Sequence, residues 1–342
     1  MLNYPKKIII SRTDSIGDVM LTLPLAGLLK KIIDGCEIIF LCHSYTKAVV
    51  SCCSNVDKII CWDEICKKSF SEQIEIFKEA DCIIHVFPNK NIAKLAKLAR
   101  IPLRIGTSHR FFHWTTCNKL ISLSRKKSSL HEAQLNFVLA RTLGAKFIYS
   151  LEEIIALQNF EAQKIEFSIK NYIDNEKFNL VLHPKSKGSG REWGVSNFAK
   201  LIEILPAEKF KIFITGSQAE GELIFDTLVK PYSEKVTDLT GKLSLEELIA
   251  FLALSDGLVA AGTGPLHIAA ALGIHVIGIF PPIPPIHPAR WAPIGKQTKV
   301  FVTNKECNYC KKSLECKCMK EVKPSDIAEY LYKIQINNKK RI

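Results

Sequence analysis

Residues 257–280, GLVAAGTGPLHIAAALGIHVIGIF, contain the pattern that decides the fold. The runs GLVAA at 257–261 and HVIGIF at 275–280 are apolar throughout. Between them, the stretch AGTGPLHIAAALG at 261–273 places glycines and a proline before a short alanine-rich helical pattern. Two apolar strands joined by a tight turn and a helix pair in parallel as a β-α-β unit. The sequence therefore predicts an α/β protein with parallel sheets.

The same alternation of apolar runs and helical patterns extends along the chain. Further strands are expected at 6–11, 37–42, 81–87, 103–108, 179–183 and 210–215. Helices are expected at 18–33, 91–100, 131–143, 197–205, after 216–217, and at 245–254 behind the S-x-x-E capping box of Ser244 and Glu247. A more polar stretch at 150–176 reads as a linker. The pattern predicts two open α/β domains facing each other, 1–160 and 161–323. A last segment, 324–342, forms a helix for which the first domain is one candidate packing partner.

Composition and charge narrow the classes of function. The chain has 342 residues, 47% hydrophobic and 24% charged, which is typical of a soluble protein of two domains. No apolar run reaches the roughly 18 residues of a membrane span, and the run at 6–11 is too short for a signal sequence, so a cytoplasmic location is expected. The net charge of +13 favours a polyanionic partner. Without a zinc-finger or RNA-binding signature, an anionic lipid or phosphorylated sugar is favoured over nucleic acid.

Twelve cysteines are many for a cytoplasmic chain. Eight lie in the first 117 residues, often inside apolar runs, where a thiol behaves as a small hydrophobe. The other four, Cys307, Cys310, Cys316 and Cys318, form a cluster near the end. The first pair has the spacing of zinc ligands, but the second pair has one intervening residue and no suitable histidine follows. A reduced, structural role is favoured, and a metal site is the alternative.

Ligands of open α/β sheets bind at the carboxyl ends of the strands. This rule selects four loops, at 11–18, 183–194, 215–222 and 262–267. In the last loop, Gly264 is expected as the helix N-cap with Pro265 at the first helical position. The backbone N–H groups of Thr263, Leu266 and His267 would then point outward, with the Thr263 hydroxyl and the His267 ring beside them. Such an N-terminus favours a bound phosphate. A plain strand-to-helix turn would use the same glycines.

The loop HPKSKGSGREWG at 183–194 places Lys185, Lys187 and Arg191 around two glycines. Next to a helix N-terminus, these side chains would form a clamp for a diphosphate. A solvated lysine-rich loop is the alternative. Trp193, a residue type that is usually buried, lies among the charges and favours the clamp.

The first loop, RTDSIGDVMLTLP at 12–24, carries two carboxylates directly after the first strand. Asp18 lies at or near a helix start, and Gly17 before it allows a close approach. As an N-cap, Asp18 would stabilise the helix by about 1 kcal/mol. As a general base, it would be kept ionised by the helix N-terminus and would accept a proton from an attacking sugar hydroxyl. These residues alone leave both interpretations open, and Asp14 is the second carboxylate of the loop.

Three segments together, 12–24, 183–194 and 239–273, resemble glycosyltransferase family 9, the ADP-heptose:lipopolysaccharide heptosyltransferases. The resemblance covers nearly the whole chain. It implies a GT-B fold, with two Rossmann-like, doubly wound parallel-sheet domains facing a central cleft, the first for the acceptor and the second for the nucleotide sugar. It also implies an inverting, metal-independent transfer of a heptose from ADP-heptose to the lipopolysaccharide core or lipid A, without a cofactor. The alternatives are another nucleotide sugar, or a non-catalytic protein of this fold that binds a nucleotide sugar or nucleic acid.

Site residues are carried over by position from the resemblance. Asp18 matches the proposed catalytic base, and Arg12 and Thr13 lie on the loop thought to face the acceptor. The donor would contact Lys185, Lys187, Arg191, Glu220 with Glu222 as its rival, Thr263, Gly264, Pro265, Leu266 and His267. Many members have an aspartate where this chain has Gly262, so the donor sugar stays open. His287 and Arg290, in the proline-rich segment that follows, are candidates to line the crevice instead.

The resemblance also gives the positive charge a partner. Lipid A and the inner core are phosphorylated, and the inner leaflet is anionic, so basic surface residues would steer and hold the enzyme there. The expected partners are a nucleotide-sugar donor and a phosphorylated glycolipid acceptor, with no nucleic acid. The expected location is cytoplasmic and peripheral to the inner membrane.

Overall fold

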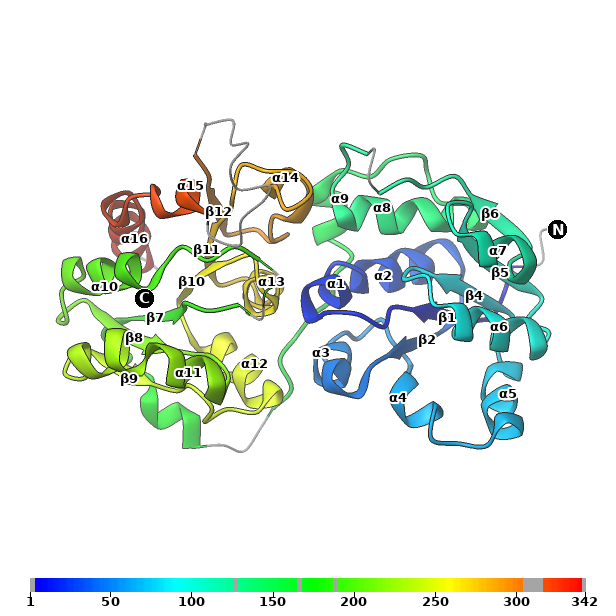
Figure 1. Ribbon diagram of the computed structural model, residues 1–342, viewed down its shortest axis with the longest axis horizontal. Helices are drawn as coiled ribbons and strands as arrows, with labels where there is room; N and C mark the ends of the chain where they lie inside the picture. The colour runs from blue at the N-terminus through cyan, green and yellow to red at the C-terminus, as the bar shows by residue number, and fades with distance from the viewer. Residues whose placement is uncertain are drawn as a thin grey trace. The chain divides into compact units, whose positions relative to one another are not determined.

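The computed structural model describes residues 4–339, apart from 126–127, 165–167, 187, 189 and 304–315. The chain forms two compact units, Met1–Glu161 and Ala162–Ile342. Each unit contains one six-stranded parallel sheet with helices on both faces (Figure 1). The α/β class predicted from the alternating pattern is confirmed.

The first sheet has the order β3-β2-β1-β4-β5-β6. Its strands are β1 (Lys7–Ser11), β2 (Glu37–Cys42), β3 (Lys58–Cys61), β4 (Cys82–His85), β5 (Leu103–Thr107) and β6 (Lys119–Ile121). In the middle, Ile9 pairs with Ile39 on one side and Ile83 on the other, and all three are buried. Helices cover both faces, so the central strands are apolar at nearly every position.

The helices of the first unit are shorter than expected. They are α1 (Ile16–Met20), α2 (Leu23–Ile32), α3 (Lys47–Val50), α4 (Trp62–Ile65), α5 (Phe70–Lys78), α6 (Lys90–Leu98), α7 (Phe111–Thr116), α8 (Glu132–Val138) and α9 (Leu151–Ile155), with 3-10 turns η1 (Ser44–Thr46) and η2 (Leu139–Leu143). The single helix expected at 18–33 is two helices. Pro24 lies in the first turn of α2, where its missing N–H is tolerated, so the helix restarts there.

The second sheet has the order β12-β11-β10-β7-β8-β9. Its strands are β7 (Phe178–His183), β8 (Phe210–Ile214), β9 (Val236–Asp238), β10 (Gly257–Ala261), β11 (His275–Ile279) and β12 (Thr298–Phe301). Its helices are α10 (Val195–Ile204), α11 (Gln218–Ile224), α12 (Leu245–Leu254), α13 (Gly264–Leu272), α14 (Pro288–Trp291), α15 (Lys317–Lys320) and α16 (Pro324–Lys339), with short turns η3 (Ser168–Tyr172), η4 (Phe225–Val229) and η5 (Lys230–Tyr232). The predicted capping box of Ser244 and Glu247 is present at the start of α12.

Counted within its own unit, each sheet has the strand order of the Rossmann fold, 3-2-1-4-5-6. The order reverses between β1 and β4 in the first sheet and between β7 and β10 in the second. Ligands of such sheets bind outside the carboxyl ends of the strands at this reversal. The fold therefore places one candidate half-site in each unit.

The last helix, α16, packs within the second unit. Its buried residues Ile327 and Leu331 share an apolar cluster with Phe198 and Leu201 of α10. Within the second unit the partner of this helix is α10, because both helices present apolar faces there. The contact with the first domain that the sequence left open stays a prediction. Cys316 and Cys318 are buried in the same cluster, and their role stays a prediction. Cys307 and Cys310 lie outside the described residues.

One buried histidine is expected to make stability depend on pH. His85, the last residue of β4, is 1% exposed and lies 5.4 Å from the ring of His113. Neither ring nitrogen of His85 has a hydrogen-bond partner among the described residues. Burial, with smaller contributions from His113 and Arg104, lowers the pKa of His85 from 6.5 to about 3. Below about pH 6.5 the unfolded chain therefore takes up a proton that the folded chain excludes. The free energy of unfolding thus decreases as the pH is lowered.

We expect His85→Leu to remove this difference in bound protons between the unfolded and the folded chain. The slope of unfolding free energy against pH should then fall by about 1.4 kcal/mol per pH unit over the range from about pH 6 to about pH 4. Urea denaturation of both proteins at several pH values measures it. An unchanged slope would mean that His85 is protonated in the folded protein.

Candidate functional site

The loop after β1 carries the candidate base. Ser15, not Asp18, is the N-cap of α1, and Asp18 is its third residue. The Ser15 hydroxyl donates a hydrogen bond of 2.5 Å to Asp18 Oδ2. The side chain of Asp18 is 19% exposed, so it can still receive a proton from a ligand. Thr13 on the same loop is buried, and its hydroxyl finds no partner among the described residues.

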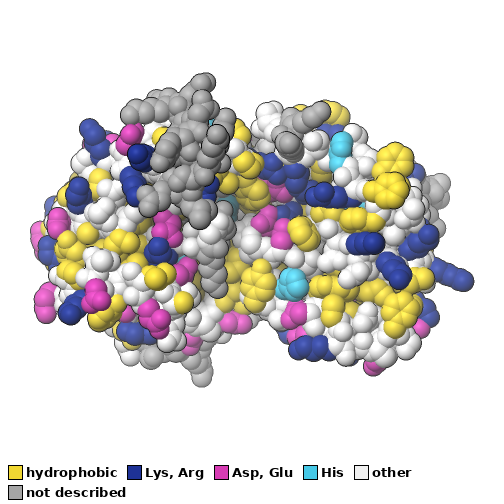
Figure 2. Space-filling view, viewed as in Figure 1, with side chains coloured by type: hydrophobic (Ala, Val, Ile, Leu, Met, Phe, Trp, Pro, Cys, Tyr) yellow, Lys and Arg dark blue, Asp and Glu magenta, His cyan; other side chains and the backbone are white. Residues whose placement is uncertain are grey.

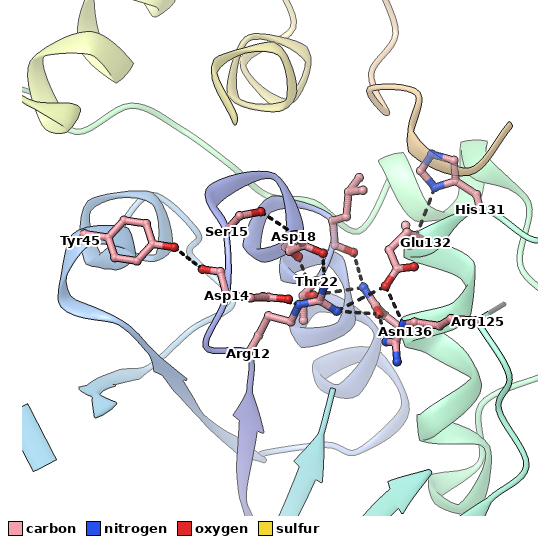
Figure 3. Close-up of polar contacts among 12 residues, drawn as sticks. Arg12, Asp14, Ser15, Asp18, Thr22, Tyr45, Arg125, His131, Glu132 and Asn136 are labelled. Atoms are coloured by element: carbon pink, nitrogen blue, oxygen red, sulfur yellow. Dashed lines mark hydrogen bonds and ion pairs between the residues drawn. The ribbon is translucent and has the colours of Figure 1, made fainter. Parts of the chain in front are cut away.

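Arg12 is the centre of this half-site (Figure 3). Its guanidinium group, 3% exposed, contacts three carboxylates. Nε donates to Asp14 Oδ1 at 2.7 Å, Nη2 donates to Asp18 Oδ1, and Nη1 lies 3.4 Å from Glu132 Oε1. Burial alone would lower the pKa of Arg12, but the three carboxylates raise it. Arg12 thus stays charged and orients Asp18.

A second arginine joins the same network from the loop before α8. Arg125 Nε donates to Glu132 Oε1 at 2.7 Å, and its Nη2 donates to Asn136 Oδ1 at 3.0 Å. Asn136 in turn donates to the carbonyl oxygen of Leu21 at 3.0 Å, which ties α8 to the segment between α1 and α2. Our sequence reasoning missed Arg125, Glu132 and Asn136. Glu132 is 120 positions from Arg12, and no local motif marks it.

Asp14 is a second candidate proton acceptor. Burial raises the pKa of its carboxyl group to about 6, against the lowering effect of Arg12 and with a further increase from Asp18. A pKa in this range suits proton transfer near neutral pH. The Tyr45 hydroxyl donates to the backbone carbonyl of Asp14 at 2.5 Å and fixes the loop.

In the second unit, the loop after β7 holds the predicted diphosphate clamp. Lys185 is paired with Glu192, with 2.5 Å between Nζ and Oε2. Arg191 differs, because its Nε is buried and has no hydrogen-bond partner among the described residues. Trp193 is fully buried and donates from Nε1 to the Val322 carbonyl oxygen at 2.9 Å, which anchors the loop. Lys187 lies outside the described residues.

The turn before α13 starts the helix one residue earlier than expected. Thr263 is the N-cap, Gly264 is the first helical residue and Pro265 follows it. Thr263 makes no side-chain cap bond, and its buried hydroxyl has no partner among the described residues. Leu266 is fully buried, so only its backbone can reach a ligand. His267 is also buried, 6% exposed, near the start of the helix.

The two loops of the second unit meet at the reversal of strand order. A Cβ atom on Gly190 would lie 3.0 Å from the Gly262 carbonyl oxygen, so the approach depends on glycine. Arg191 and Thr263 each follow one of these two glycines in the chain. Arg191 and Thr263, each with a buried polar atom that has no partner among the described residues, thus flank one close contact.

Gly262 itself packs against an aromatic ring. A Cβ atom there would lie 2.9 Å from Cε1 of Phe280, which is 1% exposed. The space that an aspartate would need at this position is therefore filled by Phe280. The departure seen in the sequence has a packing reason.

Glu220 and Glu222, the two acidic candidates for a contact with the donor, differ in position. Glu220 is the third residue of α11 and closes a capping box, in which its Oε2 accepts from Ser217 N at 2.7 Å. It is half-buried at the carboxyl edge of the sheet. Glu222 is exposed and accepts from Gln218.

The proline-rich segment forms a short helical turn. His287 is the N-cap of α14, and its Nδ1 accepts from the Ala289 N–H at 3.0 Å. The Arg290 guanidinium carbon lies 5.3 Å from the centre of the Trp291 ring. Both candidates thus belong to one local structure.

Two absences hold for the described part of the chain. There, no cluster of three or more His, Cys, Asp or Glu side chains is arranged to hold a metal ion. Likewise, no helix in these residues combines the length and the hydropathy needed to cross a bilayer.

Comparisons with known proteins agree on one family. Residues 78–320 match the family model described as glycosyltransferase family 9 (heptosyltransferase). A putative glycosyltransferase of Haemophilus influenzae is 26% identical over 304 residues, 86% of this chain and 88% of that protein. A family 9 glycosyl transferase structure from Veillonella parvula has a TM-score of 0.78 at 17% identity and covers 97% of each chain. The ADP-heptose heptosyltransferase II structure of E. coli has a TM-score of 0.76 at 16% identity, over 98% of this chain and 99% of that one. The structural likeness shows a GT-B fold, as the resemblance implied.

Proposed function

Since the chain belongs to glycosyltransferase family 9, the heptosyltransferase family, we propose that it transfers a heptose from ADP-heptose to the lipopolysaccharide core or lipid A. The transfer would proceed with inversion and without a metal ion or another cofactor. The first unit would bind the phosphorylated glycolipid acceptor, and the second unit would bind the donor.

The observation that carries the donor assignment is a pair of unpartnered polar atoms at the reversal of the second sheet. Buried polar groups in proteins are almost always hydrogen-bonded, yet Arg191 Nε and Thr263 Oγ1 have no partner among the described residues. Both flank the contact between Gly190 and Gly262, next to the N-terminus of α13. A diphosphate offers the acceptor oxygens that an arginine and a helix N-terminus bind.

The proposed reaction needs one proton acceptor and one neutralised leaving group. The acceptor hydroxyl oxygen bonds to the anomeric carbon, and its proton passes to Asp18. The bond from this carbon to the diphosphate breaks, and ADP leaves with the electron pair. Arg191, Lys185, Lys187 and the dipole of α13 would stabilise the charge that develops on the diphosphate. Arg12 and Thr13 would help to place the acceptor.

A binding experiment can identify the nucleotide of the donor. We expect ADP-heptose to raise the melting temperature more than UDP- or GDP-sugars. At equal concentration the ligand with the lowest Kd stabilises the protein most, and a ligand at about 100 times its Kd stabilises it by about 2.7 kcal/mol. Arg191→Ala should remove most of this shift, whereas Lys211→Ala, on β8, should keep it. A larger shift with another nucleotide would overturn the assignment of ADP. Binding without any transfer to a lipopolysaccharide acceptor would favour the non-catalytic alternative.

A second candidate donor, a different sugar on the nucleotide, is favoured by Gly262. We expect Gly262→Asp to destabilise the protein by about 1–3 kcal/mol, because its Cβ would meet the buried Phe280 ring at 2.9 Å. Phe280→Leu in the same chain should recover part of this loss, so the two changes should not be additive. Thermal melts of both single variants and the double variant measure it. An unchanged melting temperature in Gly262→Asp would show that Phe280 does not exclude the carboxylate. The double variant, tested with the same panel of donors, shows whether this position selects the sugar.

A further inference from the structure

The positive charge of this protein is concentrated in one stretch. Residues 82–131 contain ten Lys or Arg and no Asp or Glu, so they carry most of the net charge of +13. Three of these ten residues, Lys90, Lys94 and Lys97, lie on α6 and are exposed. Neither they nor the exposed Arg110 form an ion pair with another described residue. Unpaired cations on one helix are available to an external anion.

Large aromatic side chains are exposed on the neighbouring helix, α7. Phe111 is 88% exposed and Trp114 is 64% exposed. They are three residues apart, so they lie on the same side of the helix. Yellow and dark blue side chains lie together in Figure 2 over the region where Figure 1 labels α6 and α7. We call Lys90, Lys94, Lys97, Arg110, Phe111 and Trp114 the α6–α7 surface.

The indole N–H of Trp114 does not need a water molecule as its hydrogen-bond partner. Its indole N–H donates to the Ser108 carbonyl oxygen at 2.8 Å. The ring can therefore enter an apolar medium without leaving a hydrogen-bond donor unpaired. Tryptophan with this arrangement is typical of the interface between water and a bilayer.

The exposed apolar residues of α11 and η4 lack this charge. Leu223 and Phe225 in the second unit are 70% and 49% exposed, but Glu222 and Asp226 are their neighbours in the chain. In the first unit, the acidic Glu75 on α5 is paired with Lys78, and Glu79 at the end of this helix is paired with Lys58. In contrast to these sites, the α6–α7 surface joins aromatic rings to cations without an ion pair among the described residues.

We propose that the α6–α7 surface docks onto an anionic lipid bilayer, with Phe111 and Trp114 inserted between headgroups and the basic residues of α6 on the lipid phosphates. The inference rests on the proposed function in one respect, namely that the acceptor is a glycolipid. A basic face with aromatic residues beside it is the composition of segments that lie in the membrane interface.

The position of the surface on the sheet fits delivery of such an acceptor. The loop before α7 follows the carboxyl end of β5, and α6 begins just after the carboxyl end of β4. Arg12 follows the carboxyl end of β1 in the same parallel sheet. Docking would therefore bring the bilayer to the edge of the sheet that carries the candidate acceptor site.

Co-sedimentation of the full chain with lipid vesicles tests the proposal. The protein should pellet with vesicles of phosphatidylglycerol and phosphatidylcholine, and remain in solution with vesicles of phosphatidylcholine alone. Each basic residue lost from the surface should weaken binding about fivefold. The double variant Lys94→Glu, Lys97→Glu should therefore bind at least tenfold more weakly, and Phe111→Ser should also weaken binding. Leu223→Ser and Lys235→Glu, on the second unit, are the matched controls and should bind as the unchanged protein does.

Trp114 supplies a direct signal of insertion. Trp62 and Trp193 are buried and Trp291 is half-buried, so Trp114 is the tryptophan that reports contact with lipid. Its emission should shift to the blue on addition of anionic vesicles, and Trp114→Tyr should remove this shift. Binding without a blue shift would overturn the insertion of the aromatic residues.

The outcomes separate this proposal from the proposed function. If the α6–α7 variants lose vesicle binding but transfer sugar normally to a soluble, delipidated acceptor, the surface is a docking site. If the unchanged protein fails to pellet with anionic vesicles, or if the variants and controls bind alike, the proposal is wrong whatever the transferase activity. RNA could also be added at the same phosphate concentration as the vesicles. If the protein then leaves the vesicles and binds the RNA more tightly, the proposal is also wrong. If no donor is used but vesicle binding follows the variants, the proposed function fails and the docking surface stands.

Discussion

Asp18→Asn should reduce the rate of sugar transfer by about 10²–10⁴-fold, the range of a general base, and leave donor binding unchanged. The amide has nearly the shape of the carboxylate and keeps an oxygen toward Arg12, but it cannot accept the proton of the attacking hydroxyl. The donor is assigned to the other unit, so its affinity should not change. Steady-state transfer rates and thermal shift with the donor measure the two effects separately.

Asp14→Asn is the matched control for this variant. It removes the same charge from the same arginine, since Asp14 and Asp18 both bond to Arg12. If Asp18 is the base, Asp14→Asn should lower the rate far less than Asp18→Asn. A larger loss in Asp14→Asn would transfer the role to Asp14, whose raised pKa of about 6 makes it the natural rival.

Arg12→Met should give the largest loss of stability, about 3–5 kcal/mol, because it removes the counter-charge of partly or fully buried carboxylates. Glu132 is 1% exposed and Asp14 is 21% exposed, so solvent cannot replace the guanidinium group. Urea denaturation at neutral pH measures the loss. It should shrink as the pH falls, because protonation removes the uncompensated charges.

Arg125→Met is the control for burial. Arg125 contacts the same Glu132 oxygen, but its side chain is 23% exposed against 3% for Arg12. Its loss should therefore destabilise the protein much less. Equal losses in the two variants would show that Glu132, rather than the carboxylates on the loop after β1, determines the effect.

The strands that the sequence predicted share one property. Every predicted strand lies inside a sheet, and the four strands that were missed, β3, β6, β9 and β12, are the four edges. Inner parallel strands are covered on both faces and read as continuous apolar runs. Edge strands such as KLI at Lys119–Ile121 and VTD at Val236–Asp238 are short and half-exposed, so they have no such run.

The candidate site was predictable where it is local in sequence. The loops with Asp18, Arg191 and Thr263 follow apolar strands directly, so strand prediction and the rule for carboxyl ends select them together. The position of the helix start was wrong by one residue at Thr263, because glycine and threonine are both good N-caps. The roles of these residues stay predictions.

Hydrophobic burial repeats every few residues along a strand or helix, so local pattern was sufficient for the α/β class, the two units and the loops at the ends of the strands. Contacts between distant residues depend instead on how helices pack. Only the tertiary structure shows that Arg12 meets Glu132 across 120 positions and that Phe280 fills the space beside Gly262. It also shows that Lys185 is paired with Glu192, while Arg191 Nε has no hydrogen-bond partner in the described part of the chain. Charge partners and steric exclusion are properties of packed neighbours, and they leave no periodic signal in the chain.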